Sequence, residues 1–240
     1  DIAYRSKEEQ LECYGAFDRV VSVSGKVMQS FDEVFPGNRS TVIHNPIDSP
    51  RIRDMASAFT VDRADSLPLF VSVGRLSEEK GFDRLINTAA KLAAEGCALR
   101  IGIVGDGPER ERLERMINEQ HRGENVCLLG FIPNPYPYMA SADWFVCPSR
   151  SEGYSTVVGE SLILGTAVIT TSCAGMSELL GEDGMWGIIT ENCEKALTAG
   201  LRDILQNPES TEKYRQLAAT RGEDFSLERQ MNEIYKVIEG

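Results

Sequence analysis

The chain contains 240 residues, with 25 Lys and Arg against 37 Asp and Glu, so its formal net charge is −12 at pH 7. Hydrophobic residues at 42% and charged residues at 26% are ordinary for a folded globular protein and exclude intrinsic disorder. The acidic balance disfavours a nucleic-acid partner, because cationic contacts dominate such binding, and no apolar run approaches the roughly 20 residues of a transmembrane segment.

The N-terminus and the cysteines indicate where the protein works. The sequence DIAYRSKEEQ is polar, shows no signal peptide and lacks an initiator Met, so we expect a cytoplasmic protein and a fragment of a longer one. The cysteines form no CxxC pair and no metal-ligand spacing with His, which favours reduced core thiols over a redox or metal site. They are Cys13, Cys97, Cys127, Cys147, Cys173 and Cys193.

Short apolar runs rich in Val and Ile alternate with helical patterns along the chain. The predicted strands are 19–24, 41–44, 69–74, 99–105, 125–130, 144–147, 167–171 and 187–190. The predicted helices are 25–35, 81–95, 108–121, 134–140, 156–164, 176–180, 193–206, 209–220 and 226–239. Because the strands are apolar throughout, we expect an α/β fold with a Rossmann-like parallel sheet and helices on both faces.

Two prolines in the segment Asn45–Pro50 predict a boundary where regular structure breaks. Residues 1–48 then form the end of a preceding domain and its hinge, because they hold only one β-α-β stretch. Residues 49–225 are long enough for a complete α/β domain, and residues 226–240 add a C-terminal helix. An apolar stripe at helical spacing predicts that this helix packs on another element. The stripe is Leu227, Met231, Ile234, Tyr235 and Ile238.

In open parallel sheets ligands bind beyond the carboxyl ends of the strands, so the residues that follow each strand are candidates for a site. At the end of one strand, Gly74 allows a ligand to approach the backbone, and Arg75 and Lys80 flank a loop that opens a helix. Two cations beside a helix N-terminus suit a phosphate group. Two solvated surface cations beside Glu78 and Glu79 explain the pattern equally well.

Two further strand ends are weaker signals. Gly105-Asp106-Gly107-Pro108 joins a strand to a helix, with Pro108 suited to the first helical turn. It is not a dinucleotide fingerprint, since Arg110 stands where glycine is needed, and a tight turn without a ligand explains it. The apolar pair Phe131-Ile132 follows another strand, and a planar base or ordinary core packing accounts for it.

Paired carboxylates follow the strand 144–147. Glu152 lies in the loop ahead of a helix that Ser155 is placed to cap, and Glu160 shares a helix face with Thr156. The free N–H groups of the first turn suit an anion such as a diphosphate, and the carboxylates suit sugar or ribose hydroxyls. A capped helix with acidic neighbours is the reading that needs no ligand.

Together these segments resemble the C-terminal, donor-binding half of a retaining GT-B glycosyltransferase of glycosyltransferase family 4, also called glycosyl transferases group 1. Their order and spacing match over residues 40–239, and residues 1–44 resemble the last β-α-β unit of the family's N-terminal domain. The matching pieces are Gly74-Arg75 with Lys80-Gly81, Gly105-Asp106-Gly107-Pro108, Leu129-Gly130-Phe131, Pro148-Ser149, the hinge His44–Asp48 and the E-x7-E motif from Glu152 to Glu160.

The resemblance implies two groups of site residues. The expected catalytic residues are Glu152, which holds the transferred sugar, and Arg75 and Lys80, which bind the donor's diphosphate. The expected donor-binding residues form four groups. Gly74 and Gly105 let the nucleotide approach the backbone, and Phe131 and Ile132 hold the base. The amides of Gly153, Tyr154, Ser155 and Thr156 lie near the sugar and phosphate, and Glu160 binds the ribose.

The implied reaction moves a sugar from a nucleotide-diphosphate sugar to a glycan or lipid-linked acceptor in polysaccharide, capsule or lipopolysaccharide synthesis. Configuration is retained by same-face attack, in which the leaving phosphate accepts the acceptor's proton. Fixed cations and a helix N-terminus stabilise the leaving group, so no cofactor and no metal are expected.

The resemblance also implies how this chain fits into a larger protein. Residues 49–225 would be the nucleotide-sugar-binding domain, and the C-terminal helix would cross to an N-terminal domain that binds the acceptor. Such a protein would lie in the cytoplasm, at the inner membrane face where the acceptor is lipid-linked. We expect the isolated chain to bind the donor weakly and to transfer little. A non-catalytic nucleotide-sugar-binding module and a sugar-nucleotide epimerase are the alternatives.

Three positions depart from the family pattern. Tyr154 replaces a frequent Phe, Gly159 replaces a larger residue ahead of Glu160, and Ala167 replaces a common Pro. None of these changes removes a functional group, so they bear on sugar specificity rather than on the class of reaction.

Overall fold

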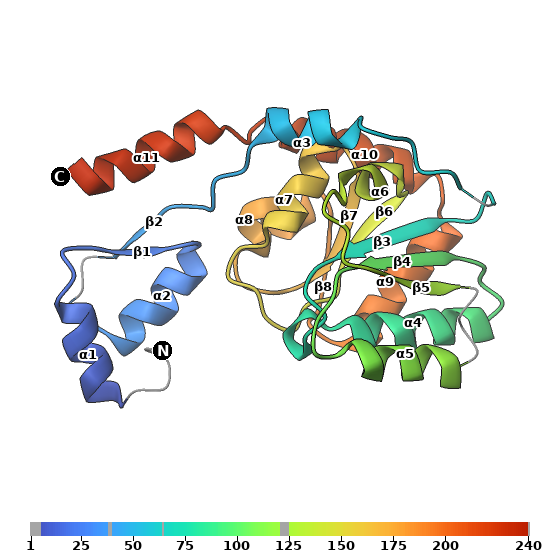
Figure 1. The fold of residues 1–240 in the computed structure, drawn as a ribbon, viewed down its shortest axis with the longest axis horizontal. Coiled ribbons are helices and arrows are strands. Elements are labelled where there is room, and N and C mark those ends of the chain that lie inside the picture. The colour runs from blue at the N-terminus through green and yellow to red at the C-terminus, as the bar shows by residue number, and fades with distance from the viewer. Residues whose placement is uncertain (1–5, 38–39, 64, 121–124, 240) are drawn as a thin grey trace.

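The computed structural model describes residues 6–37, 40–63, 65–120 and 125–239 (Figure 1). Its strands are β1 Val20–Ser22, β2 Ser40–Val42, β3 Leu69–Val73, β4 Arg100–Val104, β5 Val126–Gly130, β6 Trp144–Cys147, β7 Ala167–Thr171 and β8 Ile188–Thr190. Its α-helices are α1 Lys7–Gly15, α2 Gly25–Val34, α3 Ser49–Ala56, α4 Phe82–Ala94, α5 Arg110–Glu119, α6 Tyr136–Ser141, α7 Thr156–Ile163, α8 Met176–Leu180, α9 Glu194–Gln206, α10 Ser210–Gly222 and α11 Leu227–Glu239. The short 3-10 turns are η2 Glu78–Lys80 and η3 Glu182–Gly184.

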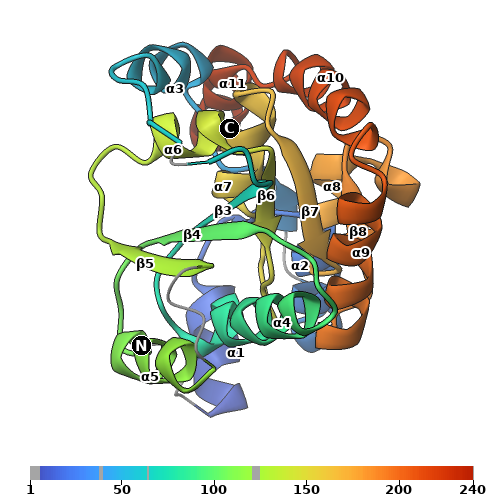
Figure 2. The same ribbon diagram turned by 90° about the vertical axis from the view of Figure 1, so that its right-hand side faces the viewer.

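The predicted fold class is confirmed. Strands β3 to β8 form one parallel sheet in the order β5-β4-β3-β6-β7-β8, and helices cover both of its faces (Figure 2). The predicted helix 108–121 is shorter, because α5 begins at Arg110 with Glu109 as its N-cap, so Pro108 precedes the helix. Its expected last residue, His121, lies outside the described residues.

Two helices near the N-terminus, α1 and α3, were not predicted from the sequence. Helix α1 begins with a capping box, in which Ser6 and Glu9 satisfy each other's backbone N–H groups. Helix α3 begins directly after the predicted boundary, where the side chain of Asp48 accepts a hydrogen bond from the N–H of Arg51. Pro50 lies in the first turn of α3, where a missing N–H is tolerated, so this proline starts a helix rather than breaking one.

The order of the strands reverses between β3 and β6. From β3 the chain adds β4 and then β5 on one side, and α6 then returns it so that β6 lies on the other side of β3, followed by β7 and β8. At such a reversal the loops that leave the two central strands turn to opposite faces of the sheet and leave a crevice between them. Where the loops after β3 and β6 leave the sheet they are still in contact, since the N–H of Arg150 donates to the carbonyl of Glu79 at 2.7 Å.

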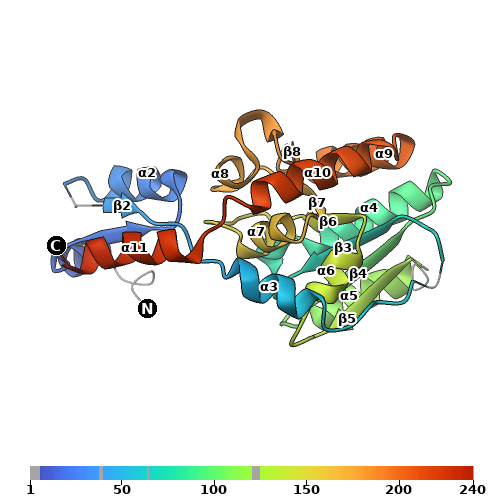
Figure 3. The same ribbon diagram turned by 90° about the horizontal axis from the view of Figure 1, so that it is seen from above.

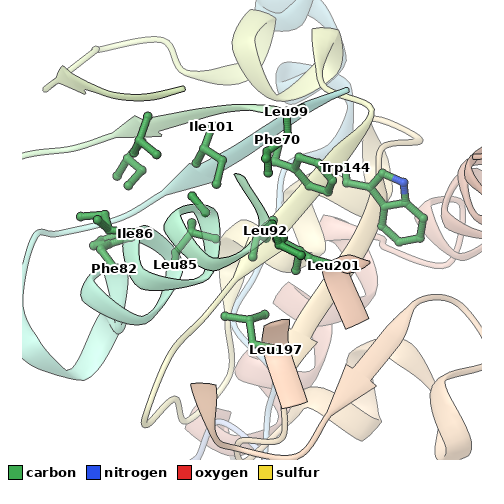
Figure 4. Close-up of a cluster of buried hydrophobic side chains, with 14 of the residues drawn as sticks. Phe70, Phe82, Leu85, Ile86, Leu92, Leu99, Ile101, Trp144, Leu197 and Leu201 are labelled. Atoms are coloured by element: carbon green, nitrogen blue, oxygen red, sulfur yellow. The ribbon is translucent and has the colours of Figure 1, made fainter. Parts of the chain in front are cut away.

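The apolar core lies on both faces of the sheet, as continuous apolar strands predict. On one face, Phe70 and Trp144 pack with Leu85 of α4, and α5 and α9 complete the layer (Figure 4). On the other face, Val71 and Phe145 pack under α6, α7, α8 and α10. The neighbours Phe70 and Val71 point to opposite faces and are both fully buried.

Residues ahead of α3 form a separate small unit. Strands β1 and β2 pair in parallel around α2, which is the predicted β-α-β stretch. Helix α11 lies at this same end of the molecule (Figures 1 and 3). Residues 43–48 form the linking segment between β2 and α3. The side-chain oxygen of Gln230 accepts a hydrogen bond from the N–H of Ile47 at 3.0 Å, which connects the start of α11 to this linking segment. The C-terminal end of the apolar stripe is not covered by any of the described residues, since Tyr235 is 51% and Ile238 is 73% exposed. No helix in the described ranges is long and apolar enough to cross a bilayer.

The prediction that the cysteines are core thiols is confirmed for Cys147, and Cys97 and Cys173 pack against the core, whereas Cys127 is exposed. All six are free thiols, yet Cys147 on the central strand β6 is the one that is buried, and Cys127 is exposed because β5 is an edge strand. Burial raises the pKa of the Cys147 thiol, which keeps it protonated and unreactive.

Packing accounts for two glycines of the motifs, through a backbone contact at Gly105 and a side-chain contact at Gly159. Gly105 has φ of +146°, and a Cβ added there would lie 1.8 Å from the carbonyl oxygen of Gly74. A Cβ on Gly159 would lie 2.5 Å from the terminal methyl of Ile47, so the departure at Gly159 makes room for the linking segment on α7. Close backbone approach thus explains Gly105 before any ligand is considered.

A comparison of two left-handed glycines tests this packing. Gly96 has φ of +84° with nothing within 4 Å of an added Cβ, so Gly96→Ala meets conformational strain alone. Gly105→Ala adds a clash with backbone, and we expect it to lower the free energy of unfolding by at least about 2 kcal/mol more than Gly96→Ala. Urea denaturation measures both, and equal losses would contradict the packing argument.

Candidate functional site

A cavity of about 420 Å³ lies at the carboxyl ends of β3 and β4, bounded by the loop after β5 and by α6 and α7. Half of the predicted site residues line it, and they come from four separate segments of the chain. These residues are Gly74, Arg75, Gly105, Phe131, Ile132 and Glu160. The cavity therefore unites residues that the sequence analysis could only place at the ends of different strands.

The loop after β5 gives the cavity an apolar end. Gly130 has φ of +76° and turns the chain, and Phe131 is 74% exposed. Ile132 and Pro133 continue this wall, and Gly105 adjoins it through a hydrogen bond from its N–H to the carbonyl of Gly130 at 2.8 Å. An exposed aromatic ring beside accessible backbone offers a flat apolar surface to a planar ligand.

Glu160 is a largely buried carboxyl group in the cavity wall. Burial raises its pKa to about 6, and a hydrogen bond with Tyr136 opposes that rise. Burial also raises the pKa of the Tyr136 hydroxyl, and the charge of Glu160 adds to the effect. Near pH 7 Glu160 is thus mostly an ionised carboxylate in a poorly hydrated place, and hydroxyl donors of a ligand would stabilise it.

Lys80 and Glu152 form an ion pair across the strand reversal. The Nζ of Lys80 lies 2.7 Å from Oε1 of Glu152, and the hydroxyl of Ser149 donates to the same oxygen at 2.9 Å. The Glu152 side chain is only 10% exposed. The Lys80 stem passes beside Gly74, with its Cδ 3.8 Å from the place of an added Cβ, so the pair lies at the edge of the cavity.

Arg75 differs from Lys80 in its surroundings. Its side chain is exposed at the cavity mouth, and it forms no salt bridge with the described residues. Its charge helps to lower the pKa of Glu79, which is set mainly by a hydrogen bond from Ser77. Arg75 is therefore available to an anion, whereas Lys80 is already paired.

The N-terminus of α7 corrects one expectation. Ser155 is the N-cap residue, but its side chain makes no capping hydrogen bond, and its hydroxyl instead lies 4.0 Å from Sγ of Cys147. Ser155 is almost fully buried there, so the hydroxyl faces the interior rather than the first turn. The first-turn N–H groups of α7 are consequently left without a side-chain cap.

Tyr154 and its neighbours lie beside the cavity rather than in its wall. The Tyr154 ring is 7% exposed and stacks on His44 with ring centres 4.6 Å apart, and burial raises its pKa to about 12. His44 in turn lies 2.7 Å from Oε2 of Glu178. Tyr154 thus packs toward the N-terminal unit, and Gly153 is in contact range of Val23 in the same unit.

Three groups that the structure brings to the site were not predicted from the sequence. Tyr136 donates to Glu160, Ser149 donates to Glu152, and Arg150 pairs with Asp83 across the strand reversal. Their signal lies in contacts between distant segments. Only Ser149 stood in a motif, next to Pro148.

A second cavity, of about 290 Å³, lies between residues 61–63 and 65–67 on one side and the strands β4 and β5 on the other. It is mostly apolar, and the arginines at its rim are already paired, Arg63 with Asp143 and Arg100 with Asp65. It contains none of the predicted site residues and offers an anion no unpaired cation, so the cavity at the strand reversal is the candidate site.

The fold and this cavity define a Rossmann-like domain with a ligand site at the reversal point of its sheet. The family described as Glycosyl transferases group 1 matches residues 57–221, and the chain belongs to that family.

Known proteins agree with this assignment. The chain is 34% identical over 185 residues to the N-acetylgalactosamine-N,N'-diacetylbacillosaminyl-diphospho-undecaprenol 4-alpha-N-acetylgalactosaminyltransferase of Campylobacter jejuni, which covers 77% of this chain and 49% of that protein. It is 30% identical over 219 residues to the GDP-mannose-dependent alpha-(1-6)-phosphatidylinositol dimannoside mannosyltransferase of Mycobacterium tuberculosis, which covers 89% of this chain and 55% of that protein. The chain thus spans about half the length of these relatives.

A solved structure agrees on the fold. The crystal structure of Anabaena HepE in complex with UDP has a TM-score of 0.80 at 20% identity, covering 100% of this chain and 69% of that one. The expected resemblance to the C-terminal part of a GT-B glycosyltransferase is confirmed.

The pKa of Glu160 predicts a dependence of stability on pH. Because this pKa rises from 4.5 to about 6 on folding, the folded state keeps a proton that the unfolded chain has lost. The stabilisation is complete below pH 4.5 and is lost as the pH rises through about 6, an effect of about 2 kcal/mol.

Glu160→Gln should therefore lack this decline. Relative to the variant, the wild-type free energy of unfolding should fall by about 2 kcal/mol between pH 4 and pH 7, as measured by urea denaturation at each pH. Glu119→Gln, at an exposed position on α5, should follow the wild type. Parallel curves for the wild type and Glu160→Gln would show that Glu160 keeps its ordinary pKa.

Proposed function

We propose that this chain forms the donor-binding part of a retaining glycosyltransferase. The enzyme would move a sugar from a nucleotide-diphosphate sugar to a glycan or lipid-linked acceptor in polysaccharide, capsule or lipopolysaccharide synthesis. The observation that carries the proposal is the set of groups that meet at one cavity: the apolar pair Phe131 and Ile132, the buried carboxylate of Glu160 and the exposed cation of Arg75 line it, and Lys80 lies at its edge. A nucleoside diphosphate presents a base, a ribose diol and a diphosphate, which suit these three kinds of group.

Each part of the donor would meet a matching group. The base would lie on Phe131 and Ile132, with its polar edge on the backbone of that loop, and the ribose hydroxyls would donate to Glu160. The diphosphate would lie between Arg75, Lys80 and the uncapped N–H groups at the start of α7, where the helix dipole favours an anion. The transferred sugar would then reach Glu152.

The proposed chemistry follows from where charge develops. As the bond between the sugar and the diphosphate breaks, negative charge grows on the leaving phosphate while the sugar becomes cationic. Lys80 and the start of α7 stabilise that negative charge, and Glu152 binds the sugar hydroxyls. The acceptor oxygen attacks from the same face and gives its proton to the leaving phosphate, so configuration is retained. Because these groups supply the positive charge, the proposal needs no metal and no cofactor.

The relatives support a lipid-linked acceptor. The Campylobacter relative is named for a diphospho-undecaprenol substrate and the Mycobacterium relative for a phosphatidylinositol dimannoside. We therefore propose that the acceptor is bound outside this chain, by an N-terminal domain of the GT-B fold. The protein would work in the cytoplasm, at the inner membrane face.

A non-catalytic nucleotide-sugar-binding module is the second candidate. The chain spans about half of the named transferases, and it contains the cavity for the nucleotide. A transfer assay with the longer polypeptide distinguishes the two candidate functions. A transferase moves the sugar to an acceptor, whereas a binding module binds the nucleotide sugar and transfers nothing.

Nucleotide affinity tests the proposal on this chain. Uridine and guanosine diphosphates are titrated by calorimetry, and at least one should bind. Lys80→Ala should weaken that binding about tenfold or more, because a charged hydrogen bond contributes about 1.5–3 kcal/mol. Lys91→Ala is the matched control, since Lys91 forms an ion pair with Glu194 away from the cavity.

Transfer by the longer polypeptide tests the catalytic part. Glu152→Gln should lower transfer about 100-fold, because it removes the charge that holds the reacting sugar and Lys80.

The two experiments can each contradict the proposal. If neither diphosphate binds this chain, donor binding is refuted. If Glu152→Gln transfers the sugar as fast as the wild type, the role of Glu152 is refuted.

A further inference from the structure

Arg150 and Asp83 form a two-pronged ion pair next to the site. Nη1 and Nη2 of Arg150 donate to Oδ1 and Oδ2 of Asp83, each at 2.7 Å. Asp83 belongs to the first turn of α4, which follows β3, and Arg150 belongs to the loop after β6. The pair therefore bridges the strand reversal, and parallel hydrogen bonds of this kind fix orientation as well as distance.

Arg150 also binds the turn that carries Lys80. Its Nη1 donates to the carbonyl of Glu78 at 2.8 Å, and its backbone N–H donates to the carbonyl of Glu79 at 2.7 Å. Both carbonyls belong to η2, the 3-10 turn that ends at Lys80. Arg150 thus holds this turn from the loop that carries Glu152.

Backbone contact makes the junction stiff. Gly81 has φ of +68°, and a Cβ added there would lie 2.2 Å from the carbonyl oxygen of Pro148. Lys80 precedes this contact on one loop, and Glu152 follows it closely on the other. The separation of Lys80 Nζ and Glu152 Oε1 therefore depends on how the two loops are held together.

The electrostatics of the pair agree with its geometry. Burial opposes the ionisation of Asp83, yet its pKa is lowered because Arg150 donates to it. The pKa of Arg150 is raised by the same hydrogen bonds. Arg112 of α5 lies 3.7 Å from Asp83, so Asp83 keeps a cationic neighbour when Arg150 is removed.

We propose that Arg150 and Asp83 are positioning residues for the donor's diphosphate, which hold the Lys80 turn against the Glu152 loop. Neither residue lines the cavity, and Arg150 donates to the turn that carries Lys80, so the pair acts through the positions of Lys80 and Glu152. The inference rests on the proposed function, since it concerns the ligand that Lys80 binds. A displacement of about 1 Å in a charged group at a reacting centre can lower a rate about 100-fold, so such positioning has a measurable effect.

The test separates positioning from simple stability. Wild type and Arg150→Ala are titrated with uridine and guanosine mono- and diphosphates. The monophosphates report on the base and ribose end of the cavity, and the additional phosphate reports on Lys80. Arg150→Ala should lower the ratio of diphosphate to monophosphate affinity about tenfold, whereas a loss of stability alone lowers both affinities together.

Two further variants refine the expectation. Arg150→Lys should recover only part of the ratio, because an ammonium group cannot make two parallel hydrogen bonds. Arg202→Ala is the matched control, since Arg202 makes the same kind of fork with Glu95 at 2.7 Å and 2.7 Å, between α9 and the end of α4. Arg202→Ala should leave the ratio unchanged.

A double-variant cycle shows whether Arg150 acts through Lys80. The ratio for Lys80→Ala combined with Arg150→Ala should equal that for Lys80→Ala alone, because the positioned group is already absent. Should Arg150→Ala fail to fold, Asp83→Asn, which leaves Arg150 in place, takes its role in the cycle.

The outcomes distinguish the two proposals. The positioning role is overturned, and the proposed function left intact, if the wild type binds a diphosphate but Arg150→Ala leaves the ratio of diphosphate to monophosphate affinity unchanged. The same holds if Lys80→Ala and Arg150→Ala lower that ratio independently in the cycle. Failure of the wild type to bind either diphosphate overturns the proposed function, and the positioning role with it.

Discussion

The loops after β3 and β6 touch each other through their backbones, and the site depends on that contact. A side chain at Gly81 would clash with the carbonyl of Pro148, because the two strands are neighbours in the sheet and their loops start side by side. This contact between the two loops brings Nζ of Lys80 within 2.7 Å of Oε1 of Glu152, although the residues are far apart in sequence. An open edge at this point would leave both groups as ordinary surface charges.

Charge is distributed around the site in matched pairs. The chain as a whole has a formal net charge of −12. Where the loops after β3 and β6 meet, Lys80 pairs with Glu152 and Arg150 pairs with Asp83. Arg75, by contrast, is exposed at the cavity mouth. A diphosphate entering the cavity would therefore compete with Glu152 for Lys80. The ion pair keeps both side chains ordered before a ligand arrives, which reduces the entropy lost on binding.

Most of the fold could be predicted from local pattern. Runs such as 144–147 and 167–171 became strands with unchanged bounds, because a strand buried on both faces is predominantly apolar rather than alternating. Helix α3 was missed, since a proline that starts a helix and a proline that ends one look alike until the cap at Asp48 is seen. The thiol of Cys127 was misplaced, because edge and central strands share one composition.

The sequence by itself determined the α/β class, the family and the segments at which ligand-binding residues stand, since these follow from short-range periodicity and from motifs within single loops. The tertiary structure decided which groups meet. It placed Glu160 against Tyr136, paired Lys80 with Glu152, turned Tyr154 toward His44 and left the hydroxyl of Ser155 facing the interior. Such contacts depend on the order of strands in the sheet, and that order is set by packing between distant segments rather than by any local run of residues.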